Sequence, residues 1–566
     1  MTNIAQIFWE QVQARKLNPF LSFRSSNLPE YQSISWQEAG SQVAQLLKCL
    51  TNLNVRPGTQ IAIFSRNSYK WIISDLAILS SKATSIPIYQ SSTPQDLVNY
   101  FNICEIEILF IEDPSKLKGP KLPHLKTIIL LDENIDKSSL DLPYEIYSWG
   151  EIVSANSTKK ISDFQEIQKQ TQSIVNTDIA SIIFTSGTSG LPKAVSLNHG
   201  NFIAAIEAFQ ERICLNQDDK FLSILPLAHI FERSACEFYA IAIGANIFIC
   251  DKAENYTSDL KHAQISYSMV VPRLLEKIYL GTLKKLGSKS ILLNIPLVKN
   301  LLIKRIKSEL APNITAFISG GAPLNPSIAK FFQKLNIPVL EGYGLTETTG
   351  GITVNAAKTN RAGTVGKILK GAEIKIAEDH EILCRGTSVF QAYYKNDQAN
   401  MEAFLTPRFQ DYTQWNLDAE NDTQKWFRTG DLGSVDSAGY LQITGRKKEL
   451  IVTSYGKKIA VNKIEQMFQT STLINQIVVF GDNRKYLAAL VNIEQGQASQ
   501  EKQEALVQAE IDSINKQLAN FEQIKKFQIL EQPLSIEAGE LTQTLKIKRN
   551  VVAQKYKKLI EQMYQT

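Results

Sequence analysis

The chain is poor in the side chains that disulfide frameworks and zinc sites require. Its 566 residues include five histidines, and none of them lies at the spacing of a zinc-ligand motif. The six cysteines are scattered and form no CxxC pair: Cys49, Cys104, Cys214, Cys236, Cys250 and Cys384. This distribution indicates neither a disulfide scaffold nor a zinc site, and it fits a reducing compartment.

Long apolar segments and a strong excess of one charge are also missing. The N-terminal MTNIAQIFWEQVQARK lacks a basic segment followed by an apolar one, and the longest strongly apolar stretch, residues 238–250, is too short to span a bilayer. We therefore expect no secretory signal, no transmembrane helix and a cytoplasmic location. The net charge of +5 is small for this length, so no nucleic-acid partner is expected.

What the chain does contain is an alternation of short β-rich runs and helical patterns. After residue 180, SIIFT, FLSILPL, ISYSMVV and ITAFISG alternate with runs such as NFIAAIEAFQERI, PRLLEKIYL and NPSIAKFFQKL, and an earlier set begins at Ile61. This order is typical of parallel strands joined by helices, and it predicts an α/β fold of doubly wound sheets. Ligands of such sheets bind at the loops where strands end.

Two further changes along the chain predict a division into domains. Short strands and turns after Gly363 indicate a small β-unit, and the segment from Gly445 to the C-terminus is lysine-rich. A chain of 566 residues is also too long for one ordinary core. We place the boundary near Lys448, between a large N-terminal domain (1–445) and a small α+β domain (446–566).

The loop TSGTSGLPK (185–193) follows an apolar run and combines four hydroxyls, two glycines and a lysine. Glycines let backbone N–H groups turn inward and the lysine adds positive charge, so the loop suits phosphate oxygens. Its spacing differs from the phosphate loop of nucleotide triphosphatases, because Gly187 and Gly190 are three apart and Ala194 follows Lys193. Taken alone, the loop is equally well explained as a solvated turn.

Six further loops follow in a recognisable order. They are LPLAHIFER (225–233), SGGAPL (319–324), EGYGLTET (341–348), WFRTGDLG (426–433), GRKKELI (445–451) and LTQTLKIKRN (541–550). Together with TSGTSGLPK they resemble the adenylate-forming superfamily of acyl- and aryl-CoA synthetases, luciferases and peptide-synthetase adenylation domains. One motif alone is a weak signal, whereas seven in the right order are a strong one. SRNSYKWIISDLAILS (65–80), the ER of LPLAHIFER and the ending TLKIKR most resemble long-chain fatty acyl-CoA and acyl-carrier-protein synthetases.

The resemblance implies a reaction of a fatty acid with ATP and Mg²⁺ to an acyl adenylate and pyrophosphate, followed by transfer to the thiol of CoA. A carboxylate and a triphosphate repel each other, so this chemistry needs cations and positioned donors more than a protein nucleophile. The implied nucleotide-binding residues are Thr185, Ser186, Gly187, Thr188, Ser189, Gly190 and Lys193 at the phosphates, Gly320, Gly321, Ala322, Glu341, Gly342, Tyr343, Gly344 and Thr346 around the adenine and α-phosphate, and Asp431 and Arg446 at the ribose.

The resemblance also implies the catalytic groups. Lys546 in TLKIKR aligns with the family's catalytic lysine, whose long ammonium side chain can stabilise charge developing at the carboxylate and the bridging oxygen. Thr346 contacts the phosphate, and His229 orients the carboxylate without exchanging protons, a buried core histidine being the alternative. Glu347 is the implied Mg²⁺ ligand, because this hard cation prefers oxygen.

Two positions are implied to serve the change between half-reactions. Lys448 matches the hinge about which the mobile small domain rotates, and Gly456 matches the loop beside the path of the thiol; composition alone would describe a charged loop. Ala194 stands where the family usually has glycine, and Val461 where it usually has proline. We expect both departures to tune rates without removing a catalytic group.

Alternatives to this function remain open on the sequence. The acceptor can be acyl carrier protein, whose phosphopantetheine carries the same reactive arm as CoA. A non-catalytic nucleotide- or lipid-binding pseudoenzyme is a second alternative, which the intact motif residues argue against. No carrier domain with a DSL-type serine follows Lys546, and no KxDG motif occurs, which disfavours a peptide-synthetase fragment and a nucleic-acid ligase.

The segment 284–307, KKLGSKSILLNIPLVKNLLIKRIK, carries seven basic residues and no acidic one. Leucines and isoleucines lie between these charges, so the segment suits a peripheral contact with the inner face of an anionic membrane. An ordinary pair of surface helices explains it equally well. The expected partners are thus a fatty acid, ATP and CoA, with acyl carrier protein and a membrane surface as further candidates.

Overall fold

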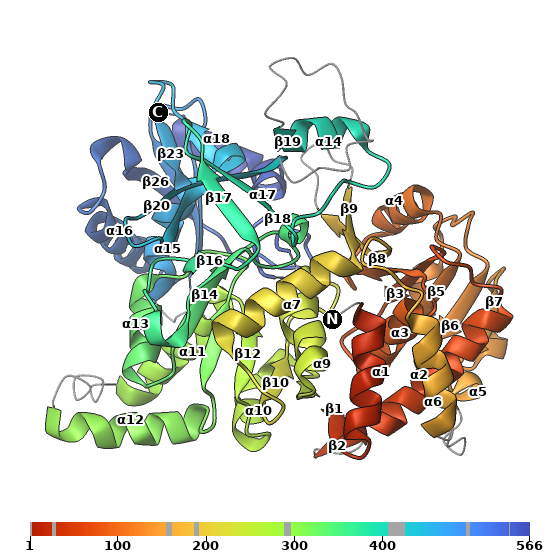
Figure 1. The fold of residues 1–566 in the computed structure, drawn as a ribbon. Coiled ribbons are helices and arrows are strands. Elements are labelled where there is room, and N and C mark those ends of the chain that lie inside the picture. Colours follow the sequence, from red (N-terminus) through yellow and green to blue (C-terminus); the bar gives the residue numbers. More distant parts are fainter. Residues whose placement is uncertain are drawn as a thin grey trace.

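Two large sheets and a smaller C-terminal unit make up the fold (Figure 1). The structure is a computed structural model that describes residues 3–24, 30–153, 161–185, 192–287, 296–405, 425–493, 499–542 and 544–565, without the side chains of 161–163 and 296–299. Five of the predicted phosphate-binding residues therefore lie outside the described residues: Ser186, Gly187, Thr188, Ser189 and Gly190. The same holds for residues 288–295 of the basic segment.

The first sheet has seven strands in the order β7-β6-β5-β3-β4-β8-β9. Neighbouring strands are parallel except for β8 and β9, which form an antiparallel edge. The TSGTSGLPK segment connects β8 to β9. The strands are β3 (Gln60–Phe64), β4 (Thr84–Ile88), β5 (Ile108–Ile111), β6 (Thr127–Leu130), β7 (Glu145–Ser148), β8 (Ile179–Thr185) and β9 (Lys193–Asn198).

The second sheet has nine strands in the order β16-β15-β14-β13-β12-β10-β11-β1-β2. Its central strands are parallel, and β2, β15 and β16 are antiparallel at the two edges. The strands are β1 (Pro19–Arg24), β2 (Tyr31–Ser35), β10 (Lys220–Ser223), β11 (Asn246–Ile249), β12 (Tyr267–Val270), β13 (Ala316–Ser319), β14 (Val339–Tyr343), β15 (Thr353–Val354) and β16 (Lys367–Ile368).

Helices cover both sheets, and some of them form a buried layer that belongs to the core of both. From Trp71 to Ser80 every residue of α3 (Tyr69–Ser80) is buried, which is expected for a helix that is apolar nearly all round. Sequence signals mark several helix starts, such as the capping box of Ser35 and Glu38 before α2. The other helices are α1 (Ile4–Arg15), α2 (Trp36–Asn52), α4 (Pro94–Cys104), α5 (Trp149–Ile152), α6 (Ile161–Thr171), α7 (His199–Ile213), α8 (Ile230–Glu232), the π-helix η3 (Arg233–Phe238), α9 (Tyr239–Ile243), α10 (Tyr256–His262), α11 (Pro272–Leu286), α12 (Pro296–Leu310) and α13 (Pro326–Lys334).

A small antiparallel sheet follows the second large sheet in the chain. Its strands are β17 (Ala372–Ile376), β18 (Glu381–Gly386), β19 (Phe404–Leu405), β20 (Trp426–Val435) and β21 (Leu441–Arg446), with α14 (Asp397–Ala403) between β18 and β19. This is the β-unit that the short strands after Gly363 predict.

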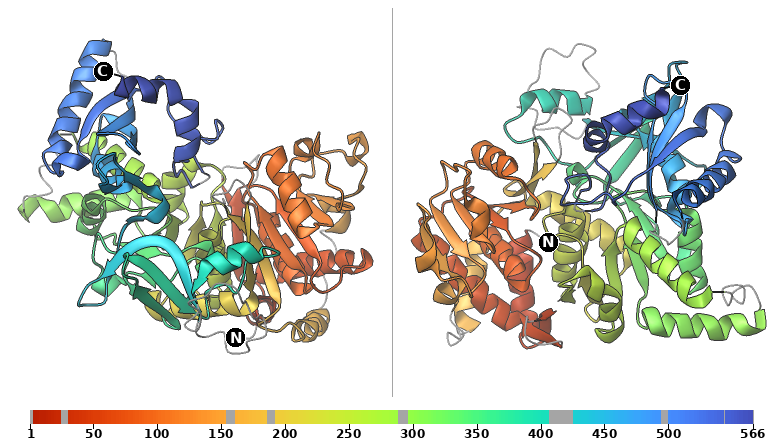
Figure 2. Two further views of the ribbon diagram at one scale, coloured as in Figure 1. Left: turned by 90° about the horizontal axis from the view of Figure 1, so that it is seen from above. Right: turned by 180° about the vertical axis from the view of Figure 1, so that it is seen from behind.

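The C-terminal unit has a core of its own on each side of its three-stranded sheet. Along β24 (Ile474–Phe480), Ile477 and Val479 pack on one side and Val478 and Phe480 on the other, which is the two-residue period of a strand. Figure 2 shows this unit beside the second sheet and away from the first. Its remaining elements are β22 (Leu450–Val452), β23 (Lys458–Ala460), β25 (Leu487–Ile493), β26 (Ile524–Ile529), α15 (Val461–Met467), α16 (Gln500–Asn515), α17 (Arg549–Lys555) and α18 (Lys557–Tyr564).

The predicted fold class is confirmed: large α/β sheets, a small β-unit and a smaller C-terminal α+β part. The antiparallel edges of both sheets differ from a purely parallel expectation, because a strand at an edge needs only one partner and can pair with it in either direction. Within the described residues, no helix has the length and apolar character needed to cross a membrane.

Candidate active site

A cleft of about 2710 Å³ lies between the C-terminal unit and the strand ends of the N-terminal part. The predicted residues that line the cleft are Thr185, Lys193, Gly321, Ala322, Glu341, Gly342, Tyr343, Gly344, Glu347, Asp431, Arg446, Lys448 and Lys546. Of the remaining predicted residues that the structure describes, Gly320 and Thr346 are chain neighbours of lining residues, whereas His229 and Gly456 are not part of the lining.

One end of the cleft is formed by the hairpin of β8 and β9. Thr185 and Lys193 are direct partners across the two strands, and the Thr185 hydroxyl donates to the carbonyl of Lys193 at 3.5 Å. The pairing fixes the two ends of the TSGTSGLPK loop and presents a hydroxyl and an ammonium to the cleft. This arrangement suits the oxygens of a phosphate chain.

Glu347 lies beside this end, in η6 (Thr346–Thr348), and its carboxylate shares a neighbour with Lys193. The hydroxyl of Tyr393 donates to Oε1 of Glu347 at 2.8 Å, and the ammonium of Lys193 lies 4.7 Å from the centre of the same ring. Burial raises the pKa of Glu347, which the Tyr393 hydrogen bond and the Arg446 and Lys193 charges oppose. A carboxylate in the lining of a cleft predicted to bind phosphates fits a hard divalent cation.

Tyr343, Asp431 and Arg446 form a second connected group in the lining of the cleft. Asp431 and Arg446 are direct partners of β20 and β21, with Arg446 Nε 3.0 Å from Asp431 Oδ1, and the Tyr343 hydroxyl donates to Oδ2 at 2.9 Å. Burial raises the pKa of Asp431, and the positive charge of Arg446 opposes the rise. The antiparallel register thus brings together the two residues predicted to bind ribose.

The loops after β13 and within EGYG bring backbone close to the cleft. Gly321 has φ of +80°, a conformation that favours glycine, and a Cβ at Gly344 would lie 2.6 Å from the Cα of Gly351. Glu341 is buried in the middle of β14, and burial raises its pKa to about 7 although the N–H of Gly363 donates to it at 3.2 Å. Small residues here leave room for a flat ring against the backbone.

His229 caps the N-terminus of α8, and its Nδ1 accepts the N–H of Phe231 at 3.2 Å. Burial lowers the pKa of the imidazole to about 4. The ring is therefore neutral near pH 7, and its proton is on Nε2 because Nδ1 is an acceptor. Both the predicted orienting role and a purely structural role are compatible with this geometry.

Lys546 reaches the cleft from the C-terminal unit. Its ammonium lies 3.2 Å from Oε1 of Glu449, and its charge also acts on Asp431. Leu545, just before it, has φ of +61°, and Thr542 and Lys546 close a tight turn through a 2.8 Å backbone hydrogen bond. Lys546 thus lies near Asp431, one of the two residues predicted to bind ribose.

The residues on either side of Lys448 have partners in different parts of the molecule. Lys447 binds Asp379 at 2.6 Å and Glu381 at 3.0 Å, both in the small β-unit. Glu449 instead binds Asn462 and Lys546 of the C-terminal unit. The change of partner falls at Lys448, the position predicted to be the hinge.

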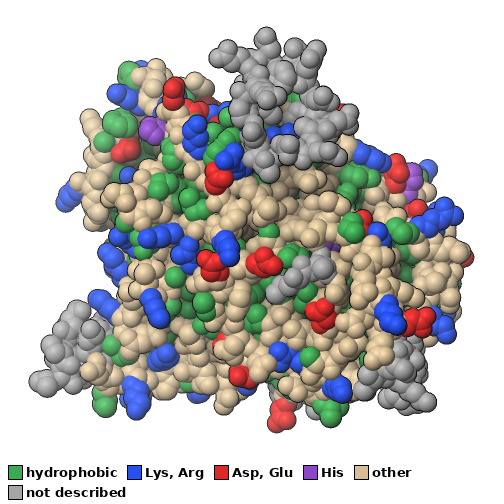
Figure 3. All heavy atoms as spheres, in the orientation of Figure 1, with side chains coloured by type: hydrophobic (Ala, Val, Ile, Leu, Met, Phe, Trp, Pro, Cys, Tyr) green, Lys and Arg blue, Asp and Glu red, His purple; other side chains and the backbone are tan. Residues whose placement is uncertain are grey.

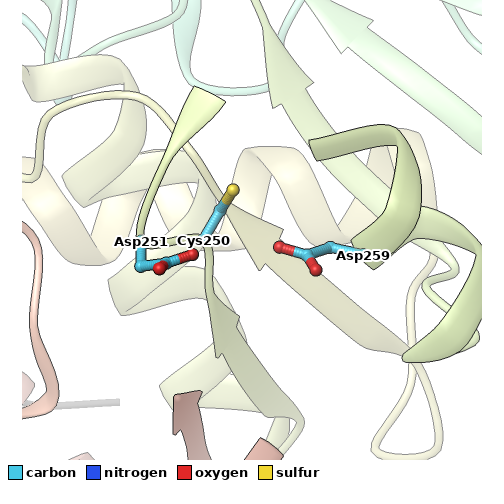
Figure 4. Close-up of side chains that lie close together, drawn as sticks. All are labelled: Cys250, Asp251 and Asp259. Carbon is cyan, nitrogen blue, oxygen red and sulfur yellow. The ribbon is translucent and has the colours of Figure 1, made fainter. Parts of the chain in front are cut away.

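A second group of polar residues lies away from the cleft. Cys250, Asp251 and Asp259 hold their possible metal ligands within 4.8 Å of one another (Figure 4). Asp259 is fully buried and forms an ion pair with Arg24, so its charge is already balanced by a guanidinium. This pairing disfavours a metal ion at the cluster.

Sequence reasoning missed Tyr393 and Glu449, which contact predicted residues, and the pair Gln466 and Gln469, which contact the SGGAPL loop. Tyr393 and the two glutamines lie outside the quoted motifs, and their contacts depend on how distant segments pack. Glu449 lies within GRKKELI, so its proximity to the hinge is the one signal that the sequence offered.

Known proteins share both the sequence pattern and the fold. The AMP-binding enzyme family matches residues 8–394, and the AMP-binding enzyme C-terminal domain matches residues 448–566. The long-chain-fatty-acid–CoA ligase FadD15 of Mycobacterium bovis is 31% identical, with 94% of this chain and 92% of that protein covered.

Two further relatives extend the comparison. The chloroplastic long-chain-fatty-acid–[acyl-carrier-protein] ligase AEE15 of Arabidopsis thaliana is 27% identical over 94% of this chain and 82% of that protein. The adenylation domain of a carboxylate reductase from Mycobacterium chelonae shares the fold, with a TM-score of 0.81, 17% identity and coverage of 99% of this chain and 91% of that one. The match to residues 8–394 and the 31% identity over nearly the whole chain show that this chain belongs to the AMP-binding enzyme family.

Proposed function

We propose that this protein is a long-chain fatty acid–CoA ligase, which forms an acyl adenylate from a fatty acid and ATP and then transfers the acyl group to CoA. The observation that carries the proposal is the single cleft that Thr185, Lys193, Asp431, Arg446 and Lys546 face together. The similarity to FadD15 over 94% of this chain supports the choice of a long-chain acid and of CoA.

In the first half-reaction a carboxylate oxygen of the fatty acid attacks the α-phosphorus of ATP, and the bond to the bridging oxygen breaks to release pyrophosphate. Thr185 and Lys193 hold the outer phosphates, and Asp431 accepts the ribose hydroxyls beside Arg446. Lys546 stabilises the charge that develops at the reacting oxygens. Glu347 would hold Mg²⁺, which neutralises phosphate charge when bound.

In the second half-reaction the thiol attacks the acyl carbon of the adenylate, and AMP leaves. We propose two domains, 1–445 and 446–566, that rotate about Lys448 between the two steps, and a path for the thiol beside Gly456. Support for the hinge comes from Lys447 and Glu449, which bind opposite domains. Gly456 lies in a turn with φ of +73°, away from the cleft in the present arrangement.

A panel of fatty acids from short to long, each tested for ATP–pyrophosphate exchange and for thioester formation with CoA, tests the proposal. We expect exchange and thioester formation to be highest with long saturated or monounsaturated acids. Activity restricted to acetate or to aromatic acids would contradict the long-chain assignment. Nucleotide binding without exchange for any acid would favour the non-catalytic alternative.

Acyl carrier protein is the second candidate acceptor, and the similarity to AEE15 favours keeping it. Both acceptors present the same phosphopantetheine thiol, so the adenylation step is common to them. The same panel with acyl carrier protein in place of CoA distinguishes them. A higher kcat/KM with acyl carrier protein would reassign the acceptor and leave the first half-reaction unchanged.

We also propose a peripheral contact between α12 and the anionic inner face of a membrane, from the cytoplasmic side. Leu301 is 78% exposed on this helix, and the lower left of Figure 3, over α12 and α13, shows basic side chains with few acidic ones. Not every charge is available: Arg305 pairs with Glu309, and Lys307 donates to the carbonyl of Asn336.

Sedimentation with liposomes at low salt tests this contact. We expect binding to vesicles that contain anionic lipid, weaker binding to zwitterionic vesicles, and a loss of binding in Leu301→Glu. No sedimentation with anionic vesicles, or an unchanged Leu301→Glu variant, would leave α11 and α12 as an ordinary surface pair.

A further inference from the structure

Tyr393 lies between two groups of the cleft that have opposite charges. Its hydroxyl donates to Glu347 Oε1 at 2.8 Å, and the ammonium of Lys193 lies 4.7 Å from its ring centre. Tyr393 lines the same cleft and is 5% exposed. A single side chain thus contacts both the carboxylate and the ammonium that the proposed function assigns to the metal and the phosphates.

The backbone around Tyr393 is fixed from two directions. Its N–H donates to Asn400 Oδ1 at 2.6 Å, and its carbonyl accepts from Asn400 Nδ2 at 3.2 Å. Tyr393 also forms a bridge to Val195 of β9, two residues after Lys193, and the N–H of Tyr394 donates to the carbonyl of Ala194 at 2.7 Å. The ring is therefore held at a set distance from the strand that carries the lysine.

The loop before Tyr393 holds Glu347 by a further bond. The N–H of Phe390 donates to the backbone carbonyl of Glu347 at 2.8 Å. Residues 390–394 thus connect the segment that bears Glu347 with the strand that bears Lys193. Removal of the tyrosine side chain would leave these backbone bonds in place and delete the contacts to the two charged groups, together with the packing of the ring against Phe390.

We propose that Tyr393 is a positioning residue that keeps Glu347 and Lys193 apart and aimed into the cleft. The hydroxyl can only donate to a carboxylate, which fixes one oxygen of Glu347 and orients the other. The face of the ring attracts the ammonium without neutralising it, so Lys193 keeps its full charge for phosphate oxygens. Without the ring, the two charges would be free to pair directly with each other.

This inference rests on the proposed function for the roles of Glu347 and Lys193, and binding measurements test it without turnover. ATP binding to the full-length protein is measured by calorimetry over a range of Mg²⁺ concentrations and also in EDTA. For Tyr393→Phe we expect the Mg²⁺ concentration at half-maximal enhancement of ATP binding to rise roughly 10-fold, because one hydrogen bond to a charged group is lost. Binding in EDTA should change little.

Tyr393→Leu removes the ring as well, so ATP binding in EDTA should also weaken, roughly 3- to 10-fold. Tyr394→Phe is the matched control: its hydroxyl accepts from Gln60 at 3.0 Å, outside the cleft. The midpoint temperatures of thermal unfolding, measured without nucleotide, should be similar for Tyr393→Phe and Tyr394→Phe. We do not expect Tyr393→Leu to restore the Mg²⁺ dependence of the wild type, because this variant lacks the hydroxyl as well.

The binding and exchange measurements test the positioning role of Tyr393 and the proposed function independently of each other. If the wild-type protein shows fatty-acid-dependent pyrophosphate exchange but Tyr393→Phe matches Tyr394→Phe at every Mg²⁺ concentration, the positioning role is wrong and the proposed function stands. If the wild type binds ATP with the expected tyrosine effects but exchanges pyrophosphate with no acid, the positioning role stands and the proposed function is wrong.

Discussion

At the scale of single residues, burial decides which side chains are charged at the site. His229 is neutral near pH 7 because burial lowers its pKa to about 4, whereas burial raises the pKa of Glu341 to about 7. A neutral imidazole with its proton on Nε2 can donate one hydrogen bond to a carboxylate but cannot balance its charge. Lysine and arginine therefore provide the positive charge of the cleft.

The first prediction concerns the pH dependence that His229 gives to stability. In the unfolded chain its pKa is about 6.5, so between about pH 4 and 6.5 the unfolded state binds more protons and stability rises with pH. His229→Asn keeps a side chain suited to the helix cap but removes this titration. The difference in unfolding free energy between pH 7.5 and pH 5 should shrink by about 1–3 kcal/mol, measured by urea unfolding.

Comparison of variant with wild type cancels the opposite contribution of Glu341, whose raised pKa costs stability as pH rises toward 7. The buried His199, whose pKa burial likewise lowers to about 4, contributes in the same sense as His229, so part of the dependence remains in the variant. An unchanged pH dependence in His229→Asn would mean that the imidazole is solvated in the folded protein.

The predicted residues that line the cleft occur in contiguous motifs, several of them at the end of a strand. Thr185 and Tyr343, the last residues of β8 and β14, are examples. Tyr393 could not be found in this way, because the residues that it contacts, Lys193 and Glu347, come from other parts of the chain. A motif indicates which ligand its own segment can bind, but it does not indicate which side chain from elsewhere in the sequence packs beside it.

At the scale of elements, a buried ion pair joins the π-helix η3 to the helix α3. Arg233 of η3 and Asp75 of α3 are both fully buried and lie 2.6 Å apart, and Arg233 also donates to Ser181 of β8 at 2.5 Å. The nearby carboxyl of Glu237 is buried, and burial raises its pKa, which favours its neutral form. The ion pair thus fixes the segment after His229 against α3 and β8.

The second prediction is that Arg233→Met strongly destabilises the N-terminal part. Loss of one partner leaves the Asp75 charge buried and unpaired, which costs about 3–5 kcal/mol of the unfolding free energy. Arg305→Met is the matched control, because it removes an exposed pair with Glu309 and should cost at most about 0.5 kcal/mol. Urea unfolding followed by tryptophan fluorescence measures both, and similar losses in the two variants would contradict the role assigned to the buried pair.

Whether a segment forms a helix or a strand was easier to predict from the sequence than which strands pair with each other. The runs ITAFISG and NPSIAKFFQKL predicted a strand and then a helix, and the structure has β13 (Ala316–Ser319) and α13 (Pro326–Lys334) there, since periodicity indicates which faces are buried. It could not predict that β1 pairs with β11, Leu21 lying opposite Ile247. Both strands are apolar, and many apolar strands would fit the same neighbour until the whole sheet is assembled.

At the scale of the whole molecule, four hydrogen bonds hold the C-terminal unit against the SGGAPL loop. Gln466 Nε2 donates to the carbonyl of Leu324 at 2.7 Å and Gln469 Nε2 to that of Pro323 at 3.2 Å. In return, Asn325 donates through its N–H to Gln469 Oε1 at 2.8 Å and through its side chain to the carbonyl of Gln466 at 3.1 Å. This contact stabilises the arrangement in which Lys546 faces the cleft.

The third prediction is that the double variant Gln466→Ala, Gln469→Ala slows adenylation but not thioester formation. Loss of three neutral side-chain hydrogen bonds worth about 1 kcal/mol each should lower pyrophosphate exchange by up to about 10²-fold. Thioester formation from supplied acyl adenylate and CoA should be retained, because it needs the rotated arrangement. Gln508→Ala, on an exposed face of α16, is the control, and equal exchange in control and variant would contradict the role of this contact.

The last prediction is that two variants fail in opposite half-reactions, one in adenylation and the other in thioester formation. Lys546→Ala should lower pyrophosphate exchange by about 10²–10³-fold, the cost of one preorganised charge donor, but it should still convert supplied acyl adenylate to thioester. Lys548→Ala, which removes another positive charge from the lining of the cleft, should keep both steps. Lys448→Pro should keep exchange and lose thioester formation, because proline fixes φ near −65° and obstructs rotation at the hinge. If both variants lost both steps equally, either the lysine or the hinge would be wrongly placed, or one chain would not alternate between two active arrangements.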